Sequence, residues 1–314
     1  MKKNSLLTFV VILLQASIAT AQKADTVRAR VSYTYSIVEN TSKPDSTREE
    51  QMMLLLGKNA SLYTSLDKVV EAEKRKKEME EMAKQFEQGL IKNIKMSPGK
   101  RTTGNDIYIY RNEKKMFTKQ RIVNNYLTED SMPAIDWKLS NDTLTISGLK
   151  CQKATAYFKG RDYTVWYCPE IPFSSGPWKL NGLPGLIVQA SDLKKEINFK
   201  FDGFEVVNAS EIKTQMPVAK PQAVIPGQVM VIGGYEGTNL TTASIIELPK
   251  DAIKTTEKEI NNLKEALRKD PAGFINSSMG GMSGDSKVVF KAAPGSTTVK
   301  PATVLNTIEL PEKK

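Results

Sequence analysis

Apolar and polar residues alternate along much of the chain before residue 208. The longest run extends from Val27 to Ile37, with apolar residues at the odd positions and Arg, Ser and Thr at the even ones. A period of two over this length is typical of a strand with one buried face. Further strands, bounded by turn residues, are predicted at 51–56, 60–64, 107–110, 116–123, 135–139, 144–146, 154–158, 163–167, 186–189 and 197–207.

Two segments have the period of a helix instead. Residues 67–95 contain no Pro and dense charge, and their apolar residues fall three or four apart. We expect this helix to cover the sheet with a face made of Met79, Met82, Phe86 and Leu90. Residues 251–269 predict a second helix, in which Thr256 and Glu259 have the spacing of a capping box.

These patterns predict the fold class and the division of the chain. The succession of strands favours a mainly β fold, a curved antiparallel sheet or open barrel with covering helices. Residues 22–207 form the expected β domain, with the helix at 67–95 inserted into it. Residues 208–314 form a C-terminal extension with the helix at 251–269, candidate strands at 229–232 and 243–248, a glycine-rich loop at 279–285 and a mobile tail.

The first 21 residues have the three parts of a secretory signal peptide. Lys2 and Lys3 are followed by an apolar stretch over residues 6–18 and by the small-residue pattern that ends at Ala21. A membrane span takes about 20 apolar residues, more than this stretch offers. We therefore expect cleavage near Ala21 and a periplasmic or secreted protein without a transmembrane segment in its mature chain.

Composition narrows the function classes. The 314 residues carry a formal net charge of +10, but the basic residues are spread out and no basic stretch is interleaved with aromatic residues, so no nucleic-acid partner is expected. Histidine is absent, which removes the commonest general base and metal ligand. We expect no metal and no cofactor, and the chain contains no persuasive catalytic set. A carboxylate-dependent enzyme is the alternative, because a pair of carboxylates can catalyse hydrolysis without histidine. The candidates for such a pair are Asp142, Asp162, Glu170, Asp192 and Asp202.

The string Gly-Leu-Pro-Gly-Leu-Ile at 182–187 resembles the defining motif of the GLPGLI family of exported bacterial proteins. The flanking residues over 135–205 agree in order with that family, and Asn-Thr-Ile-Glu-Leu at 306–310 also looks like a family position. The resemblance implies export and a β-rich fold but no reaction. The strand order and the Phe-alternating strand at 197–201 are similar to periplasmic lipoprotein carriers, which is an analogy of fold alone.

The glycines and prolines around this motif predict a specified backbone path rather than a catalytic loop. Pro fixes φ and Gly permits positive φ, so the segment is expected to make a rigid corner before a buried strand. Pro184 and Gly185 suit the central pair of a type II turn. The residues assigned to this structural motif are Gly176, Pro177, Gly182, Leu183, Pro184, Gly185, Leu186 and Ile187.

Four nearby residues are candidates for ligand binding. Trp137, Trp166 and Trp178 could line a cleft, although a Trp is more often part of a core. Arg161 could bind an anionic group or stack on a ring, and the plainer alternative is an ion pair with Asp162, Glu170 or Asp192.

Cys151 and Cys168 are the only two cysteines, and they flank the expected hairpin at positions that could face each other. Because export would place them in an oxidising compartment, we expect a disulfide between them. Two buried free thiols are the alternative.

The sequence supports three functional hypotheses. The first is a periplasmic or cell-envelope binding or accessory protein, whose partner is a hydrophobic ligand, a peptide or another envelope protein. The second is a histidine-free, carboxylate-dependent hydrolase of envelope or extracellular glycans. The third is a structural partner of an outer-membrane complex, which predicts a large exposed apolar patch.

Overall fold

The computed structural model describes residues 24–43, 45–90, 99–207, 243–271, 273, 274, 277 and 306–312. The expected signal peptide, the candidate strand at 229–232 and the glycine-rich loop at 279–285 lie outside these residues.

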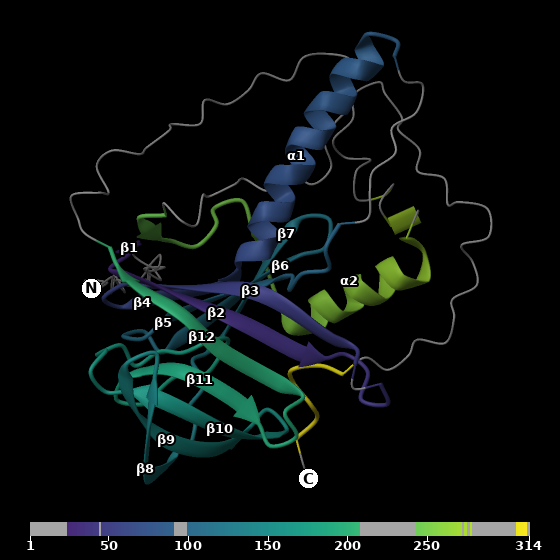
Figure 1. The fold of residues 1–314 in the computed structure, drawn as a ribbon. Coiled ribbons are helices and arrows are strands. Elements are labelled where there is room, and N and C mark those ends of the chain that lie inside the picture. Colours follow the sequence, from purple (N-terminus) through teal and green to yellow (C-terminus); the bar gives the residue numbers. More distant parts are fainter. Residues whose placement is uncertain are drawn as a thin grey trace, which may run out of the picture.

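Twelve strands form one large sheet (Figure 1). They are β2 (Ala29–Val38), β3 (Thr47–Leu56), β4 (Ala60–Ser65), β5 (Asn105–Tyr110), β6 (Lys115–Arg121), β7 (Asn125–Ser131), β8 (Lys138–Ile146), β9 (Leu149–Phe158), β10 (Arg161–Cys168), β11 (Leu186–Asp192), β12 (Ile197–Val206) and β14 (Ile253–Thr255). Their spatial order is β14-β7-β6-β5-β4-β3-β2-β12-β11-β10-β9-β8. All neighbours are antiparallel except β14, which pairs parallel to β7. The mainly β class and the open, unclosed sheet are confirmed.

Three strands of the sheet differ from the sequence prediction, one of them being β14, which lies within residues 251–269 that were predicted as helical. β7 was not predicted, because its buried residues number only two and the rest of the strand is polar and partly or fully exposed. The end of the predicted strand at 135–139 and the predicted strand at 144–146 belong to one strand, β8, which begins only at Lys138 and has a register shift between Leu139 and Thr143. β8 lies at the edge of the sheet and is largely exposed, so no alternation of apolar residues marks its middle.

Two apolar clusters hold the sheet, one on each face. The larger takes the odd residues of β2 and the even residues of β3, together with the inward residues of β9 to β12. We call the sheet face that it covers the inner face. Its largest fully buried side chains include Tyr33, Tyr163, Tyr167, Phe199, Leu54 and Leu180. The smaller cluster covers the other face of β3 to β7, where the short ladder of β1 (Asp25–Thr26) and β13 (Ile245–Ile246) also lies.

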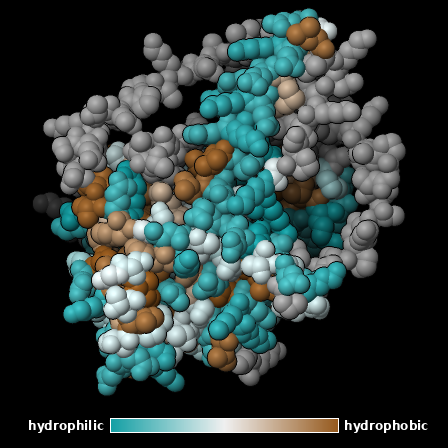
Figure 2. Space-filling model, viewed as in Figure 1, coloured by the Kyte–Doolittle hydropathy of each residue, from teal (hydrophilic) through white to brown (hydrophobic). Residues whose placement is uncertain are grey.

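Helix α1 (Leu66–Glu87) begins as predicted but does not cover the sheet. Ser65 caps it by accepting a hydrogen bond from the amide of Lys68 at 3.0 Å, and its first turn packs through the buried Val69. Beyond that turn the helix rises away from the strands (Figure 1), and it is hydrophilic along most of its length (Figure 2). Phe86 is 47% exposed, and Leu90, just beyond the helix, is 70% exposed.

The expectation of a covering face on α1 is therefore wrong. Its physical cause is the run of charged residues at 73–78, Glu-Lys-Arg-Lys-Lys-Glu, which separates the buried Val69 from the apolar residues that begin at Met79. A helix without a continuous apolar stripe gains little from lying on a sheet. The helix also ends earlier than residue 95, at Glu87, followed by Gly89 with φ 70°.

Helix α2 (Glu257–Lys269) confirms the second predicted helix. The capping box of Thr256 and Glu259 is present in both directions, so the regular helix starts there and not at residue 251. Ile260 is its buried residue. Within the described part of the chain, neither helix combines the length and the apolar character needed to cross a membrane.

Candidate functional site

Charged side chains are buried where several strands begin or end at one end of the inner face. The pairing of Ile197 with Ile37 and of Tyr163 with Asp192 brings the end of β2 and the starts of β10 and β12 to the same place. β3 begins there too, since Val38 pairs with Thr47. We call this region the polar end. Its charged residues are Glu39, Arg48, Glu50, Arg161, Asp192 and Glu196.

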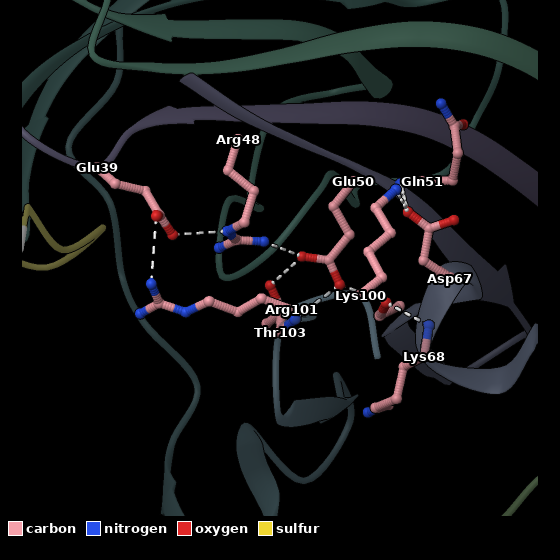
Figure 3. Close-up of polar contacts among 10 residues, drawn as sticks. Glu39, Arg48, Glu50, Gln51, Asp67, Lys68, Lys100, Arg101 and Thr103 are labelled. Carbon is pink, nitrogen blue, oxygen red and sulfur yellow. Dashed lines mark hydrogen bonds and ion pairs between the residues drawn. The ribbon is translucent and has the colours of Figure 1, made fainter. Parts of the chain in front are cut away.

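The first cluster of the polar end is built on Glu50, whose side chain is 0% exposed (Figure 3). Its carboxylate accepts hydrogen bonds from Arg48 Nη1 at 2.5 Å and from the hydroxyl of Ser65. It also accepts two bonds from Thr103, through the amide and the hydroxyl, both at 2.7 Å. A buried carboxylate is stable only when it is paired in this way.

Further ion pairs extend this cluster toward α1 and toward solvent (Figure 3). Glu39 accepts from Arg48 Nε at 2.9 Å and from Arg101 at 3.2 Å. Asp67, in the first turn of α1, accepts from Lys100 at 2.6 Å. Burial alone would lower the pKa of Arg48, but its hydrogen bonds to Glu39 and Glu50 raise that pKa overall. The cluster thus fastens the base of α1 and the segment at 99–103 to the sheet.

The second cluster is built on Arg161, the first residue of β10, which is 3% exposed. Nη1 donates to Asp192 at 2.7 Å and to Glu196 at 2.9 Å. Nε donates to the carbonyl of Ile308 at 3.1 Å. Nη2 donates to Asn306 Oδ1 and to the carbonyl of Thr307, both at 2.6 Å. The guanidinium therefore uses all five N–H groups, three of them on residues 306–308.

Residues 306–312, the C-terminal segment, lie across this end of the sheet (yellow in Figure 1). The amide of Asn306 donates to the carbonyl of Glu39 at 2.7 Å, and the amide of Leu310 donates to the carbonyl of Lys159 at 3.0 Å. Glu309 forms ion pairs with Lys179 at 2.6 Å and with Lys159 at 3.7 Å.

We call the surface that holds the C-terminal segment the segment site. It consists of Val38, Glu39, Lys159, Gly160, Arg161, Lys179 and Glu196. Gly160 is required there for two reasons: its φ is 79°, and a Cβ would lie 2.6 Å from the carbonyl oxygen of Leu310.

The four residues proposed for ligand binding lie in different surroundings. Arg161 pairs with Asp192, one of the partners considered from the sequence, and also with Glu196. Trp178 is 6% exposed and packs on Tyr163, with ring centroids 6.2 Å apart, beside the segment site. Trp137 donates its indole N–H to the carbonyl of Asn181 at 2.8 Å. Trp166 is half-buried against the main core.

The Gly-Pro motif forms a buried corner that places Trp178 and Lys179 beside the C-terminal segment. Gly185 has φ 151°, and a Cβ there would lie 2.3 Å from the carbonyl oxygen of Cys168. Gly182 also has positive φ, at 91°. Of the motif residues, Gly176, Pro177, Leu183, Gly185, Leu186 and Ile187 are buried, whereas Gly182 and Pro184 are exposed.

Cys151 and Cys168 are buried free thiols, so the predicted disulfide is absent from the structure. The ladder between β9 and β10 ends at the pair of Tyr167 and Gln152, one step before the two cysteines would pair. Burial raises the pKa of the Cys151 thiol to about 11, with a further rise from Cys168. The neutral thiol is the stable form there and packs as a small apolar side chain.

The carboxylates considered for hydrolysis lie in different environments. Asp192 is buried against Arg161, whereas the other four are exposed: Asp142, Asp162, Glu170 and Asp202. Asp142 on the edge strand β8 pairs with Lys153 on the neighbouring β9 at 2.9 Å. Among the described residues, no group of His, Cys, Asp and Glu could hold a metal ion.

Sequence reasoning missed Glu50, Arg48 and Asn306 as members of a site. A signal for Glu50 was present, since it shares the phase of Met52 and Leu54 on the buried face of β3. A charge in phase with a buried apolar stripe marks a carboxylate that needs partners. No local pattern could indicate that Asn306 meets β2, because 268 residues separate it from its partner Val38.

The chain was compared with known proteins. A sequence-family model described as a protein of unknown function (Porph_ging) matches residues 158–189. No curated protein matches the chain. Two solved structures of PNGF-II, in space groups P21 and C2, are similar with TM-scores of 0.40 and 0.40 and identities of 12% and 13%.

Each PNGF-II match covers 58% of this chain. The matched region makes up 29% of the PNGF-II chain in one structure and 28% in the other, which is less than a third of its length. The stretch matched by the family model holds the β9–β10 turn, Arg161, Trp178 and the Gly-Pro motif. Over residues 158–189 the chain is therefore similar to a family described only by its unknown function.

Proposed function

We propose that the protein is an exported binding or accessory protein of the bacterial cell envelope, and that its segment site receives an extended peptide segment. Export is supported by Lys2, Lys3 and the apolar stretch that precedes Ala21. The resemblance of residues 182–187 to the GLPGLI motif supports the same assignment.

One observation carries the peptide-binding part of this proposal. Arg161, almost fully buried, directs two of its N–H groups at main-chain carbonyls of the C-terminal segment, those of Thr307 and Ile308. Two main-chain amides of the segment donate to the body of the protein in return, those of Asn306 and Leu310. Main-chain hydrogen bonds give affinity for any extended segment, while side-chain pockets give specificity.

A peptide suits the structure better than a hydrophobic ligand held by the inner face. Tyr33, Tyr163 and Phe199 are at most 1% exposed there, so their rings are enclosed by the rest of the core. The segment site, by contrast, offers a charged and hydrogen-bonding surface whose geometry already fits an extended chain.

The test uses the full-length chain with its own segment weakened. Asn306→Ala removes the side-chain contacts of that residue, and Ile308→Asp places a charge against the apolar cluster, so the segment should leave the site. A labelled peptide with the sequence of residues 306–312 is then titrated and its fluorescence anisotropy measured. We expect saturable binding that a peptide of scrambled order does not show. Equal signals from the two peptides would refute the proposed function.

A further inference from the structure

Both the oxygen and the nitrogen of the Asn306 side-chain amide form hydrogen bonds with the segment site. Its Oδ1 accepts from Arg161 Nη2 at 2.6 Å. Its Nδ2 donates to the carbonyl of Val38 at 3.0 Å and to Glu196 Oε2 at 3.3 Å. A side chain that both accepts and donates is thus matched to a donor and two acceptors.

We propose that Arg161, Val38 and Glu196 form an asparagine-selective subsite, and that the partner of the segment site is an extended segment carrying asparagine at this position. This inference rests on the proposed function and names the class of its ligand. An aspartate would turn a carboxylate toward Glu196 and the Val38 carbonyl, so that acceptors would face acceptors without a proton between them. Alanine would leave the same groups unpaired.

The rest of the segment adds a second, weaker requirement. Glu309 lies between Lys179 and Lys159, so an acidic residue three positions after the asparagine fits this surface. Residue 307 is exposed, and Arg161 contacts its main-chain carbonyl rather than its side chain. Many residue types therefore fit at this position. The segment class is therefore Asn, any residue, an apolar residue, then an acidic one.

Four peptides test the subsite against the full-length chain that carries Asn306→Ala and Ile308→Asp. They have the sequence of residues 306–312 with Asn, Asp, Gln or Ala at the first position. We expect the Asn peptide to bind about tenfold more tightly than the others, or better still. Adding Glu196→Gln to the protein should bring the affinities of the Asn and Asp peptides closer together, because a glutamine amide can donate to the aspartate.

Glu170→Gln is the matched control, since Glu170 is exposed and outside the segment site, and it should leave the ratio unchanged. Equal affinities of the Asn and Asp peptides overturn the asparagine subsite while the proposed function stands. A ratio that Glu196→Gln does not move also overturns it, because Glu196 would not be the discriminating group. Binding of none of the four peptides above a scrambled control overturns both proposals.

Discussion

The backbone amide of Asn306 donates to the backbone carbonyl of Glu39 at 2.7 Å, and this contact joins the two charged clusters. On one side, Glu39 uses its carboxylate to hold Arg48 of the Glu50 cluster. On the other side, Asn306 uses its amide group to meet Arg161. The end of β2 therefore connects the base of α1 with the C-terminal segment.

Arg161 should be essential for stability, because it connects the buried Asp192 and the partly buried Glu196 with the C-terminal segment. Arg161→Ala leaves Asp192 buried without its cation, and removal of one partner from a buried pair typically costs about 3–5 kcal/mol. The free energy of unfolding, measured in urea, should fall by that amount.

Arg28→Ala is the control for Arg161→Ala, since Arg28 directly precedes β2 and is exposed. Its effect should stay within about 0.5 kcal/mol. Equal stability of the two variants would contradict the central place given to Arg161.

Glu50 should hold the base of α1. Glu50→Gln replaces a carboxylate that accepts four hydrogen bonds by an amide that must turn its NH₂ group toward one of the donors. We expect a loss of about 3 kcal/mol in unfolding free energy. Limited proteolysis should also cut faster between residues 66 and 104.

Glu49→Gln is the matched control for Glu50→Gln, because Glu49 is the preceding residue on β3 and is exposed. Its stability and its cleavage pattern should match those of the wild type. If Glu49→Gln and Glu50→Gln behave alike, the Glu50 cluster does not anchor the helix.

Gly185 should tolerate no side chain. Gly185→Ala adds a Cβ at φ 151° that lies 2.3 Å from the carbonyl oxygen of Cys168, so the corner must move. The expected loss is about 3 kcal/mol or more. At Gly104 a Cβ meets no atom within 4 Å, so Gly104→Ala is the control. Comparable thermal midpoints for the two variants would argue against a specified corner.

The sequence predicted the strands best where one face is buried. β2 and the hairpin of β9 and β10 follow from alternation alone, and the capping box fixed the start of α2. Edge positions were less predictable, because β8 meets solvent and has no apolar phase to reveal it. The placement of α1 failed for another reason: the spacing of Met79 and Phe86 suggested a covering stripe, but the charged run at 73–78 separates that stripe from the buried Val69 at the base of the helix.

The site was predicted only in part, because its contacts join residues that lie far apart in the sequence. Arg161, Trp178 and the positive φ of Gly185 could be anticipated from local residue types. The partners of Arg161 at Asn306 and Thr307 could not, because 145 and 146 residues separate them from it. Ion-pair partners in a folded chain depend on strand order, which single-sequence patterns do not determine.

Stability should fall at alkaline pH. Burial raises the pKa of Cys151 to about 11 and the pKa of Tyr110 to about 12, from ordinary values of 9.0 and 10.0. Above pH 9 the unfolded chain therefore releases protons that the folded chain keeps, so the stability gained below pH 9 is lost as pH rises toward 12. Urea midpoints measured at about pH 8, 9.5 and 10.5 should decrease in that order.

Tyr110→Phe gives the control for this pH dependence. Among the described residues, the hydroxyl of Tyr110 is one of the buried groups without a hydrogen-bond partner. Its removal should therefore leave stability at neutral pH unchanged or improved, and should make the alkaline decrease shallower. A midpoint that stays constant from pH 8 to 10.5 would show that these groups are not shielded from water.

The most direct measurement of the central claim follows two backbone amides by NMR in the ¹⁵N-labelled, unmodified protein. The amides of Asn306 and Leu310 donate to Glu39 and Lys159, and both should be protected from hydrogen exchange. Excess unlabelled peptide with the sequence of residues 306–312 should displace the segment and make both amides exchange faster, while amides in β2 stay protected. The account would be contradicted if the two amides exchanged at the unprotected rate before peptide is added. It would also be contradicted if their exchange rates did not change at any peptide concentration.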